Sequence, residues 1–337
     1  MERAISAAGE ASIPATPGAR AMRILFCGST FPSTRPYLQE RLPAPMGDEI
    51  RVWSGGDLSA QLEGVDVVIP LMRRIDAELM DAGHFRLIQQ WGAGLEGVDL
   101  AAARARGIWV ANVPTTGGNS ESVAEHAVLL MLALLRQLPL AQASVLSGLL
   151  GVPLGRTLAG RTVCLCGLGT IARPLADLLR PFGVRLLGLT RDPDDPKVAA
   201  YGLDQCFSHN QRELCLAQTD ILVLCLPLTE GTRNFIGARE LAWLPAGSYL
   251  VNIGRGGLVD YGALHAALAC GHLAGAGLDV FWQEPIPVDD PLLALPNVIA
   301  TPHVGGATDR SYVDIAGAIA LNIERLRQGE GPLNQAI

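Results

Sequence analysis

The sequence has few charged side chains and almost no lysine. Charged residues make up 18% of its 337 residues, Lys197 is the single lysine among 26 basic residues, and the formal net charge is −7. Proteins that bind a phosphate backbone carry a basic stripe or patch on their surface. Because acidic residues are in excess and no basic stretch stands out, nucleic acid is not an expected partner of this chain.

The sequence also lacks a hydrophobic run that would cross a bilayer. The longest apolar stretch, residues 123–138, contains Glu125, His126 and Arg136, whereas a spanning helix needs about 20 predominantly apolar residues. Residues 1–21 have neither the basic start nor the apolar run of a signal peptide. We therefore expect a buried helix within 123–138, a frayed extension at 1–21 and no membrane partner.

The cysteines do not form the pattern of a disulfide framework. There are seven, an odd number, and no second Cys or His pair accompanies Cys164 and Cys166 to complete a zinc site. Scattered unpaired cysteines are typical of a reducing compartment. We expect a cytoplasmic protein without a metal, in which Cys164 and Cys166 lie on one face of a strand as core residues.

Hydrophobic residues, in contrast, are abundant and make up 49% of the chain. At roughly 150 residues per domain, the length predicts about two domains, each with a sizeable core. A chain this apolar with so little charge also favours a large interface between subunits. We expect an oligomer rather than a monomer.

Short apolar segments that end at glycine or proline alternate with helical stretches along the chain. In the first part, strands are predicted at 22–27, 65–69, 87–91 and 108–111, with helices at 76–83 and 100–106. From residue 158 the alternation restarts, with a helix at 170–182 and strands at 162–166, 184–189, 221–226, 249–253, 275–280 and 298–300. This alternation predicts an α/β protein with two doubly wound parallel sheets.

A domain boundary is indicated near residue 115. Ser122 and Glu125 have capping-box spacing at the head of the long apolar helix, and the preceding glycines predict a hinge over 115–119. The helical stripe at 310–327 has no strand behind it, so we expect it to pack on the first domain. We therefore predict a discontinuous domain, 1–114 with 307–337, interrupted by a second domain at 115–306.

A glycine-rich turn follows the first strand of this second domain. Gly167, Gly169 and Ala172 have the G-x-G-x-x-[GA] spacing between a predicted strand and a predicted helix. The first glycine permits a tight turn, the second lets the backbone approach a pyrophosphate, and the helix N-terminus offers N–H groups to the anion. The turn predicts dinucleotide binding; binding of S-adenosylmethionine is the alternative.

The end of the next strand indicates which dinucleotide is bound. An acidic residue at this point accepts hydrogen bonds from the ribose of NAD, whereas this chain has Thr190 and Arg191, which suit a 2′-phosphate. We therefore prefer NADP over NAD. The alternative is that Asp192, Asp194 or Asp195 reaches back to the ribose of NAD.

Three further polar residues follow the carboxyl ends of later strands, where open α/β sheets bind ligands. Arg255 lies in a glycine-rich loop, Glu284 precedes Pro285, and His303 follows a Thr-Pro pair. Each alone fits a structural role, as an ion-pair partner, a turn acid or a core histidine. Together they suit acid–base chemistry on an anionic substrate.

Several spaced motifs occur together in a fixed order along residues 22–328. With them the chain resembles the D-isomer-specific 2-hydroxyacid dehydrogenase family, in which a Rossmann-type cofactor domain is inserted in a flavodoxin-like substrate domain. The motifs are Gly92-Ala93-Gly94, Asn112-Val113-Pro114 leading to 121–126, the turn at Gly167, 227–232, 252–255 and 301–303.

The resemblance implies a role for each candidate site residue. Arg255 looks like the arginine that binds the substrate, and His303 looks like the general acid/base. Glu284 looks like the hydrogen-bonding partner of His303. Backbone N–H groups around Ala93 and Gly94 would hold the substrate carboxylate. On the cofactor side the implied contacts are Thr170 and Ile171 at the pyrophosphate, Pro227 and Thr232 at the adenosine end, and Ile253, Asp279 and Gly305 at the nicotinamide end.

The implied activity is hydride transfer between NAD(P)H and a small 2-oxo or 2-hydroxy acid of the D-series, with glyoxylate or hydroxypyruvate as the kind of substrate. Oxidation of phosphite or formate, and a non-catalytic nicotinamide-sensing role like that of co-repressors with this fold, are the alternatives. Relatives dimerise through the region that corresponds to 138–160, which here lacks the usual tryptophan and charge. The resemblance therefore also implies a homodimer.

Overall fold

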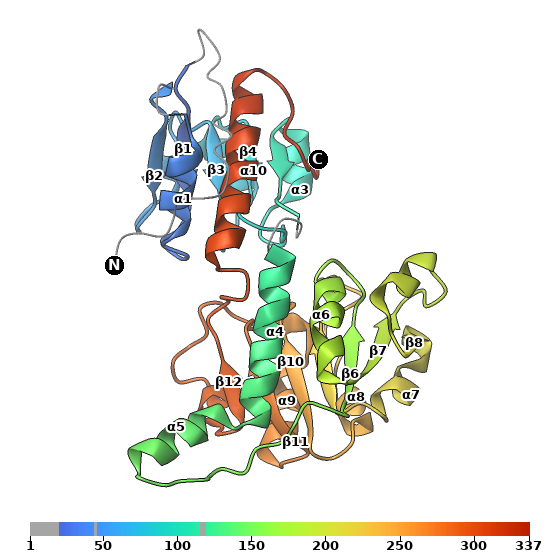
Figure 1. The fold of residues 1–337 in the computed structure, drawn as a ribbon. Helices are drawn as coiled ribbons and strands as arrows, with labels where there is room; N and C mark the ends of the chain where they lie inside the picture. The colour runs from blue at the N-terminus through green and yellow to red at the C-terminus, as the bar shows by residue number, and fades with distance from the viewer. Residues whose placement is uncertain (1–19, 44–45, 115–118) are drawn as a thin grey trace. The chain divides into compact units, whose positions relative to one another are not determined.

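The computed structural model describes residues 20–43, 46–114 and 119–337. The chain divides into two compact units (Figure 1): unit 1 comprises residues 1–117 and 309–337, and unit 2 comprises residues 118–308. The expected extension, apart from Arg20 and Ala21, and the expected hinge, apart from Asn119, lie outside the described residues.

Unit 1 is built on a five-stranded parallel sheet in the order β2-β1-β3-β4-β5. This is the 2-1-3-4-5 order of flavodoxin-like folds. The strands are β1 Arg23–Phe26, β2 Glu49–Val52, β3 Val67–Ile69, β4 Leu87–Gln89 and β5 Trp109–Ala111. The helices are α1 Thr34–Arg41, α2 Ala77–Ala82, α3 Leu100–Ala105 and α10 Asp309–Arg327.

The C-terminal helix α10 belongs to the core of unit 1. Its residues Ile315, Ile319 and Ile323 are buried against β1 residues such as Ile24, and Figure 1 shows the helix beside the sheet. Apolar residues that repeat every three to four positions lie on one side of a helix, and this side is buried against the sheet. The C-terminal segment thus completes the core that the N-terminal segment begins.

Unit 2 contains a seven-stranded parallel sheet in the order β12-β11-β10-β9-β6-β7-β8. The direction of strand order reverses between β6 and β9, as in dinucleotide-binding folds. The strands are β6 Thr162–Cys166, β7 Arg185–Thr190, β8 Gln205–Ser208, β9 Ile221–Leu224, β10 Ser248–Asn252, β11 Leu273–Leu278 and β12 Val298–Ala300. The prediction of two doubly wound parallel sheets is confirmed.

Helices cover both faces of the second sheet. Buried residues of α4 Asn119–Leu135 and α6 Ala172–Leu179 pack on one face. Those of α7 Arg212–Leu216, α8 Ala238–Trp243 and α9 Tyr261–Ala269 pack on the other. The remaining α-helix, α5 Leu138–Leu146, buries only Ser144. Short 3-10 helices lie at η2 Ser59–Gln61, η3 Arg180–Phe182, η4 Pro196–Tyr201, η5 His209–Gln211, η6 Gly256–Leu258 and η7 Pro291–Ala294.

The capping-box prediction at Ser122 is wrong. Helix α4 already includes Asn119, so Ser122 lies within the helix, and its hydroxyl lies 2.8 Å from that of Thr308. The pattern misled because serine three residues before glutamate also occurs inside helices, where the backbone N–H groups are already paired. Thr308 is the last residue of unit 2, so this contact joins the two ends of the unit.

The long apolar stretch is a core helix, as predicted. In α4, ten residues are buried, among them Leu130 and Leu134 against the sheet. Within the described residues no single helix is long and apolar enough to cross a bilayer; by length and composition only α4 and α5 together would do so, and they are bent by 56°. Cys164 and Cys166 are fully buried in the core beneath α7 and α8.

Candidate active site

The carboxyl edge of the seven-stranded sheet brings together loops that are far apart in the sequence. The register aligns Cys166, Leu224 and Asn252 at the ends of neighbouring strands. All the strands are parallel, so the loops that follow them leave from the same edge. The candidate residues of unit 2 lie in or beside these loops.

The glycine turn after β6 fits a pyrophosphate. Gly167 has φ 97°, and a Cβ there would come within 3.0 Å of Leu226, so only glycine is accommodated. A Cβ at Gly169 would meet no atom within 4 Å, which leaves open space above the turn. Ala172 is fully buried where α6 begins, which permits the close helix–strand packing that the motif requires.

The turn is held by a residue that the motif does not include. The hydroxyl of Tyr201, at the end of η4, donates to the carbonyl oxygen of Leu168 at 2.6 Å. This hydrogen bond occupies the carbonyl oxygen of Leu168. The N–H groups of the turn are then the groups that can contact an anion. Nothing in the sequence marks Tyr201, because it lies 33 residues from Leu168.

At the end of the second strand, Thr190 closes β7 and pairs in register with Ser208 of β8. Arg191 follows and is exposed. Two of the three nearby acids take part in local turns: Asp192 accepts the N–H of Asp194 at 3.2 Å, and Asp195 accepts that of Lys197 at 2.9 Å.

The loop that follows β9 is closed on itself by Thr232. Its hydroxyl donates to the carbonyl oxygen of Pro227 at 2.7 Å and accepts the N–H of Thr229 at 2.8 Å. The two residues that the sequence assigns to the adenosine end of a cofactor are therefore brought together in one tight loop.

The loop that carries Arg255 is fixed by its neighbour Asn252. The amide of Asn252 donates to the carbonyl oxygen of Arg255 at 2.9 Å and accepts the N–H of Gly254 at 3.1 Å. A Cβ at Gly256 would overlap the backbone of Phe281. This loop therefore packs directly on the loop that follows β11. The sequence marked Asn252 only as part of a motif and did not indicate this role.

His303 and Glu284 are brought together as predicted for a hydrogen-bonded pair. The ring Nδ1 of His303 lies 2.6 Å from Glu284 Oε2, and Glu284 Oε1 accepts the N–H of Phe281 at 2.9 Å. Their side chains are 30% and 14% exposed. Because a carboxylate only accepts, the proton of this contact resides on Nδ1, which leaves Nε2 as the nitrogen able to exchange a proton.

Asp279 holds the turn that carries His303. Its carboxylate accepts the hydroxyl of Thr301 at 2.6 Å and the N–H groups of Val304 at 2.9 Å and Gly305 at 2.8 Å. Burial raises the pKa of this carboxyl, but hydrogen bonds from His126, Thr301 and the two backbone groups outweigh burial and lower the pKa below 3.8.

The backbone of His303 is itself strained. Its φ is 55°, in the left-handed region that is uncommon for residues other than glycine. The hydrogen bonds of Asp279 on the residues that flank it stabilise this conformation. The position of the imidazole thus depends on a carboxylate that the sequence assigned to a cofactor. Ile253 and Gly305, the other two residues assigned to the nicotinamide end, are buried.

The loop at 92–94 lies in unit 1, at the end of β4. All three of its carbonyl oxygens accept hydrogen bonds, Gly92 from the Val113 N–H at 2.9 Å, Ala93 from the Asn112 amide at 2.8 Å and Gly94 from the Gln90 amide at 2.8 Å. Among the described residues, no acceptor takes the N–H of Ala93 or Gly94. The loop therefore offers donors alone, which suits a carboxylate.

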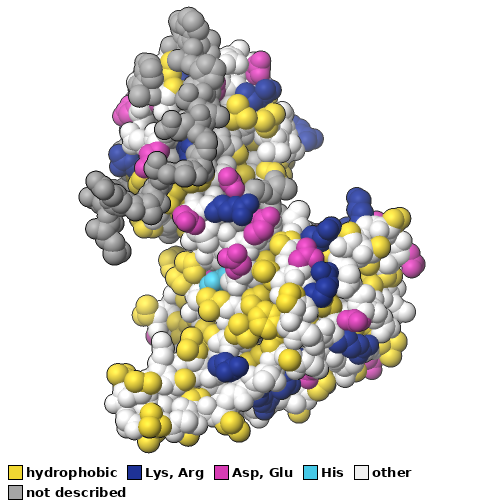
Figure 2. Space-filling view, viewed as in Figure 1, with side chains coloured by type: hydrophobic (Ala, Val, Ile, Leu, Met, Phe, Trp, Pro, Cys, Tyr) yellow, Lys and Arg dark blue, Asp and Glu magenta, His cyan; other side chains and the backbone are white. Residues whose placement is uncertain are grey.

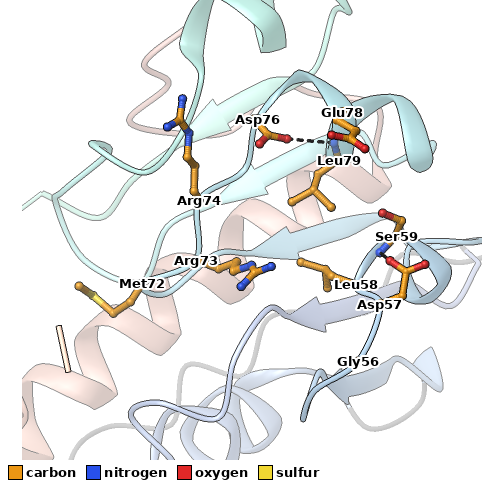
Figure 3. Close-up of a pocket in the computed structure, with 10 residues that line it drawn as sticks. All are labelled: Gly56, Asp57, Leu58, Ser59, Met72, Arg73, Arg74, Asp76, Glu78 and Leu79. Atoms are coloured by element: carbon orange, nitrogen blue, oxygen red, sulfur yellow. Dashed lines mark hydrogen bonds between the residues drawn. The ribbon is translucent and has the colours of Figure 1, made fainter. Parts of the chain in front are cut away.

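Gln90 connects this loop to the one after β3. Its amide also donates to the carbonyl oxygen of Leu71 at 3.1 Å. Beyond Leu71 lies a pocket of about 450 Å³. Its walls, drawn in Figure 3, are residues 56–59 after β2, 72–74 after β3 and the start of α2. The guanidinium of Arg73 lies 4.9 Å from the centre of the Trp53 ring. The sequence marked neither Gln90 nor this pocket.

The predicted site residues thus fall into two groups. Arg255, Glu284, His303 and the predicted cofactor residues lie in unit 2, whereas Ala93 and Gly94 lie in unit 1. Within the described ranges, no three His, Cys, Asp or Glu side chains are arranged to hold a metal ion.

Comparison with known proteins gives a consistent result. Residues 128–305 match the family described as D-isomer specific 2-hydroxyacid dehydrogenase, NAD binding domain. A glyoxylate reductase of Korarchaeum cryptofilum is 34% identical over 285 residues, which cover 81% of this chain and 83% of the reductase. A D-3-phosphoglycerate dehydrogenase of Mycobacterium bovis is 34% identical over 313 residues, but these span only 58% of its length.

A solved structure is similar over almost the whole chain. It is that of an NADPH-dependent glyoxylate/hydroxypyruvate reductase from Sinorhizobium meliloti, in complex with NADP and malonate. The two chains are 32% identical and superpose with a TM-score of 0.79, covering 94% of this chain and 96% of the reductase.

Proposed function

This chain belongs to the D-isomer-specific 2-hydroxyacid dehydrogenase family and is an NAD(P)-dependent oxidoreductase; we propose that it reduces a small 2-oxo acid with NADPH. The observation that carries the proposal is the contact between His303 and Glu284 at the sheet edge that also carries the glycine turn. An imidazole oriented by a carboxylate beside a dinucleotide site is the arrangement that proton exchange coupled to hydride transfer requires.

In this proposal His303 is the general acid/base. Glu284 holds Nδ1, so Nε2 is the atom that gives a proton to the carbonyl oxygen during reduction and removes it in the reverse direction. When bound, the nicotinamide supplies or accepts the hydride. Asp279 keeps His303 in its left-handed backbone conformation throughout, so the ring needs no reorganisation for the reaction.

Two groups recognise the acid end of the substrate. The guanidinium of Arg255 pairs with the carboxylate and the reacting oxygen, a task for which its planar donors are suited. The N–H groups of Ala93 and Gly94 are the second proposed set of donors to a carboxylate, supported by the hydrogen bonds that occupy the carbonyl oxygens of their loop.

The cofactor is held along the carboxyl edge of the second sheet. Gly167, Gly169, Thr170 and Ile171 bind the pyrophosphate, Pro227 and Thr232 the adenosine end, and Ile253, Asp279 and Gly305 the nicotinamide end. Thr190 and Arg191 bind the 2′-phosphate of NADP in preference to the ribose of NAD. This preference is supported by the exposed Arg191 and by the local turns that occupy Asp192 and Asp195.

Glyoxylate and hydroxypyruvate are the proposed kind of substrate, since two of the proteins compared are named for reduction of one or both. The functional domains are 1–114 with 307–337, and 115–306. Location in the cytoplasm is supported by seven cysteines that are all free in the structure.

We also propose a homodimer, in which a second copy covers α5 and the segment after it. Large hydrophobic side chains are exposed there, among them Val145 at 75%, Leu146 at 90%, Leu150 at 95% and Leu154 at 88%. Figure 2 shows hydrophobic side chains gathered at the lower left, where Figure 1 places α5. Apolar surface of this extent is typical of an interface between subunits.

A single screen tests the activity. Purified protein is incubated with NADH or NADPH and a panel of 2-oxo acids, with formate and phosphite assayed in the oxidative direction. Oxidation of NADPH by glyoxylate or hydroxypyruvate, lost in His303→Gln, is the expected result. A His303→Gln variant with full turnover contradicts the assignment of the acid/base, and no oxidation of either cofactor contradicts the proposed activity.

A further inference from the structure

We propose that His209 is part of the site for the 2′-phosphate of NADP(H), as a third donor beside Thr190 and Arg191. The proposal rests on the NADP preference proposed above and assigns a residue that no sequence motif marks. It is carried by the strand register, by an unpartnered ring nitrogen and by the charges that surround this ring.

The register places His209 next to the end of β7. Thr190 and Ser208 are partners in the parallel pair of β7 and β8, and His209 follows Ser208 directly as the first residue of η5. The loops that begin at Arg191 and His209 therefore leave neighbouring strands at the same edge. In doubly wound folds this edge receives the adenosine part of the dinucleotide.

The imidazole also faces the loop assigned to the adenosine end. Its ring centre lies 4.8 Å from that of Phe235 at an angle of 55°. The N–H of Phe235 donates to the carbonyl oxygen of Thr232 at 3.2 Å. His209 thus connects the loops after β8 and β9 beside Arg191, which follows β7.

One nitrogen of this ring has no partner. Nε2 is shielded from water and makes no hydrogen bond in the described part of the chain. Buried polar atoms are almost always paired, because leaving one unpaired costs about 1–3 kcal/mol. An unpaired ring nitrogen beside a ligand site indicates a partner that arrives with the ligand.

The surrounding charges indicate that this partner is an anion. Burial lowers the pKa of His209, and the positive charges of Arg191 and Arg212 lower it further. The carboxylate of Glu240 is engaged with Arg212 at 3.2 Å and with the N–H of Gly237 at 3.1 Å. The ring is therefore a neutral donor next to cations, and a phosphate group supplies the missing negative charge.

The ring reaches the phosphate by rotating about χ2. This torsion is broad for histidine, so Nε2 turns from its shielded position without a change in the backbone. A neutral N–H donor adds a hydrogen bond to those of the Thr190 hydroxyl and the Arg191 guanidinium. Three donors from two neighbouring loops would then enclose one phosphate.

The test compares two cofactor fragments that differ only in this phosphate. The affinities of 2′,5′-ADP and 5′-AMP are measured by isothermal titration calorimetry on the full chain, so the readout does not depend on turnover. His209→Phe retains a ring against Phe235 but removes both nitrogens. His209→Gln retains an amide donor. His265→Phe is the matched control, since His265 also contacts an aromatic ring, that of Tyr261.

We expect wild type to bind 2′,5′-ADP more tightly than 5′-AMP. His209→Phe should weaken the binding of 2′,5′-ADP about tenfold, the loss typical of one hydrogen bond to a charged group, and leave the binding of 5′-AMP unchanged. His209→Gln should recover part of this loss, and His265→Phe should resemble wild type. A structural role alone would weaken both ligands equally and would overturn the proposal.

Two other outcomes are informative in different ways. If wild type discriminates between the fragments and His209→Phe discriminates equally well, the role of His209 is wrong while the NADP preference stands. If wild type binds 5′-AMP as tightly as 2′,5′-ADP, the NADP preference itself is wrong, and the role of His209 is overturned with it.

Discussion

The ring Nε2 of His126 lies 2.8 Å from the hydroxyl oxygen of Thr301. The same hydroxyl donates to Asp279, so it can only accept from His126, and the proton of this contact resides on Nε2. Helix α4, the end of β11 and the turn at His303 are joined by this chain of hydrogen bonds. The position of His303, the proposed acid/base, therefore depends on a helix on the face of the sheet.

Asp279→Asn tests this network. An amide cannot accept all the bonds that the carboxylate accepts, so at least one buried donor loses its partner. We expect the free energy of unfolding at pH 7 to fall by about 1–3 kcal/mol, measured by urea denaturation. Asp192→Asn, at an exposed turn, is the control.

The pH dependence of this effect follows from the sign of the pKa shift. The pKa of Asp279 is lower in the folded chain than its ordinary value of 3.8. Its contribution to stability is therefore fully present above that value and is lost as the pH falls through the folded pKa. The difference between wild type and Asp279→Asn should narrow at acid pH, and a constant difference down to about pH 3 would contradict the assigned charge state.

Glu284→Gln tests the orientation of His303. The amide can still accept the N–H of Phe281, but its NH₂ group would face Nδ1 and favour the wrong tautomer. We expect kcat to fall on the order of 100-fold with little change in the KM of the cofactor. Glu230→Gln, at an exposed position, should leave both constants unchanged. An unaltered kcat in Glu284→Gln would show that Glu284 is an ordinary turn acid.

Apolar runs were sufficient to predict the central strands and two of the edge strands, β5 and β12, but not the other two edge strands. The sequence did not predict two strands, β2 Glu49–Val52 and β8 Gln205–Ser208. It also did not predict helix α1. Both strands lie at sheet edges and are only partly buried. An edge strand has solvent on one side and needs fewer apolar residues, so its sequence resembles that of a loop.

Candidate site residues were easier to select from the sequence than the contacts that hold them in place. Arg255 and His303 could be selected because they occupy short motifs after strands. The contacts of His126 with Thr301, and of Tyr201 with Leu168, join residues 175 and 33 positions apart. Such pairs depend on strand order and helix packing, which no local pattern contains.

Arg191→Ala tests the cofactor preference. Removing the guanidinium would delete the proposed charge-assisted hydrogen bonds to the 2′-phosphate, so the KM for NADPH should rise about 10–100-fold while that for NADH changes little. Arg104→Ala, at an exposed arginine of unit 1, is the control. If the ratio of the two KM values stays the same in Arg191→Ala, the 2′-phosphate is recognised elsewhere or not at all.

The exposed apolar segment gives a prediction about assembly. Charge placed at Leu146 and Leu150 would have to be buried without a partner in a dimer. The double variant Leu146→Glu, Leu150→Glu should therefore sediment as a monomer in analytical ultracentrifugation, whereas wild type should sediment as a dimer. Leu214→Glu, which alters a leucine that is 62% exposed in α7, should remain dimeric. A monomeric wild type would contradict the proposed assembly.

The stability of unit 1 should depend on Arg327, in the last turn of α10. Its guanidinium pairs with Asp48 at 2.7 Å and Glu324 at 2.8 Å, and all three side chains are less than 5% exposed. Arg327→Met leaves two buried carboxylates without their cation, which should lower the free energy of unfolding by about 3–5 kcal/mol. Arg325→Met is the matched control, because its pair with Glu330 is only partly buried, with side chains 32% and 51% exposed, and is worth less than about 1 kcal/mol. Equal urea midpoints for the two variants would show that the buried network adds no stability beyond that of a surface pair.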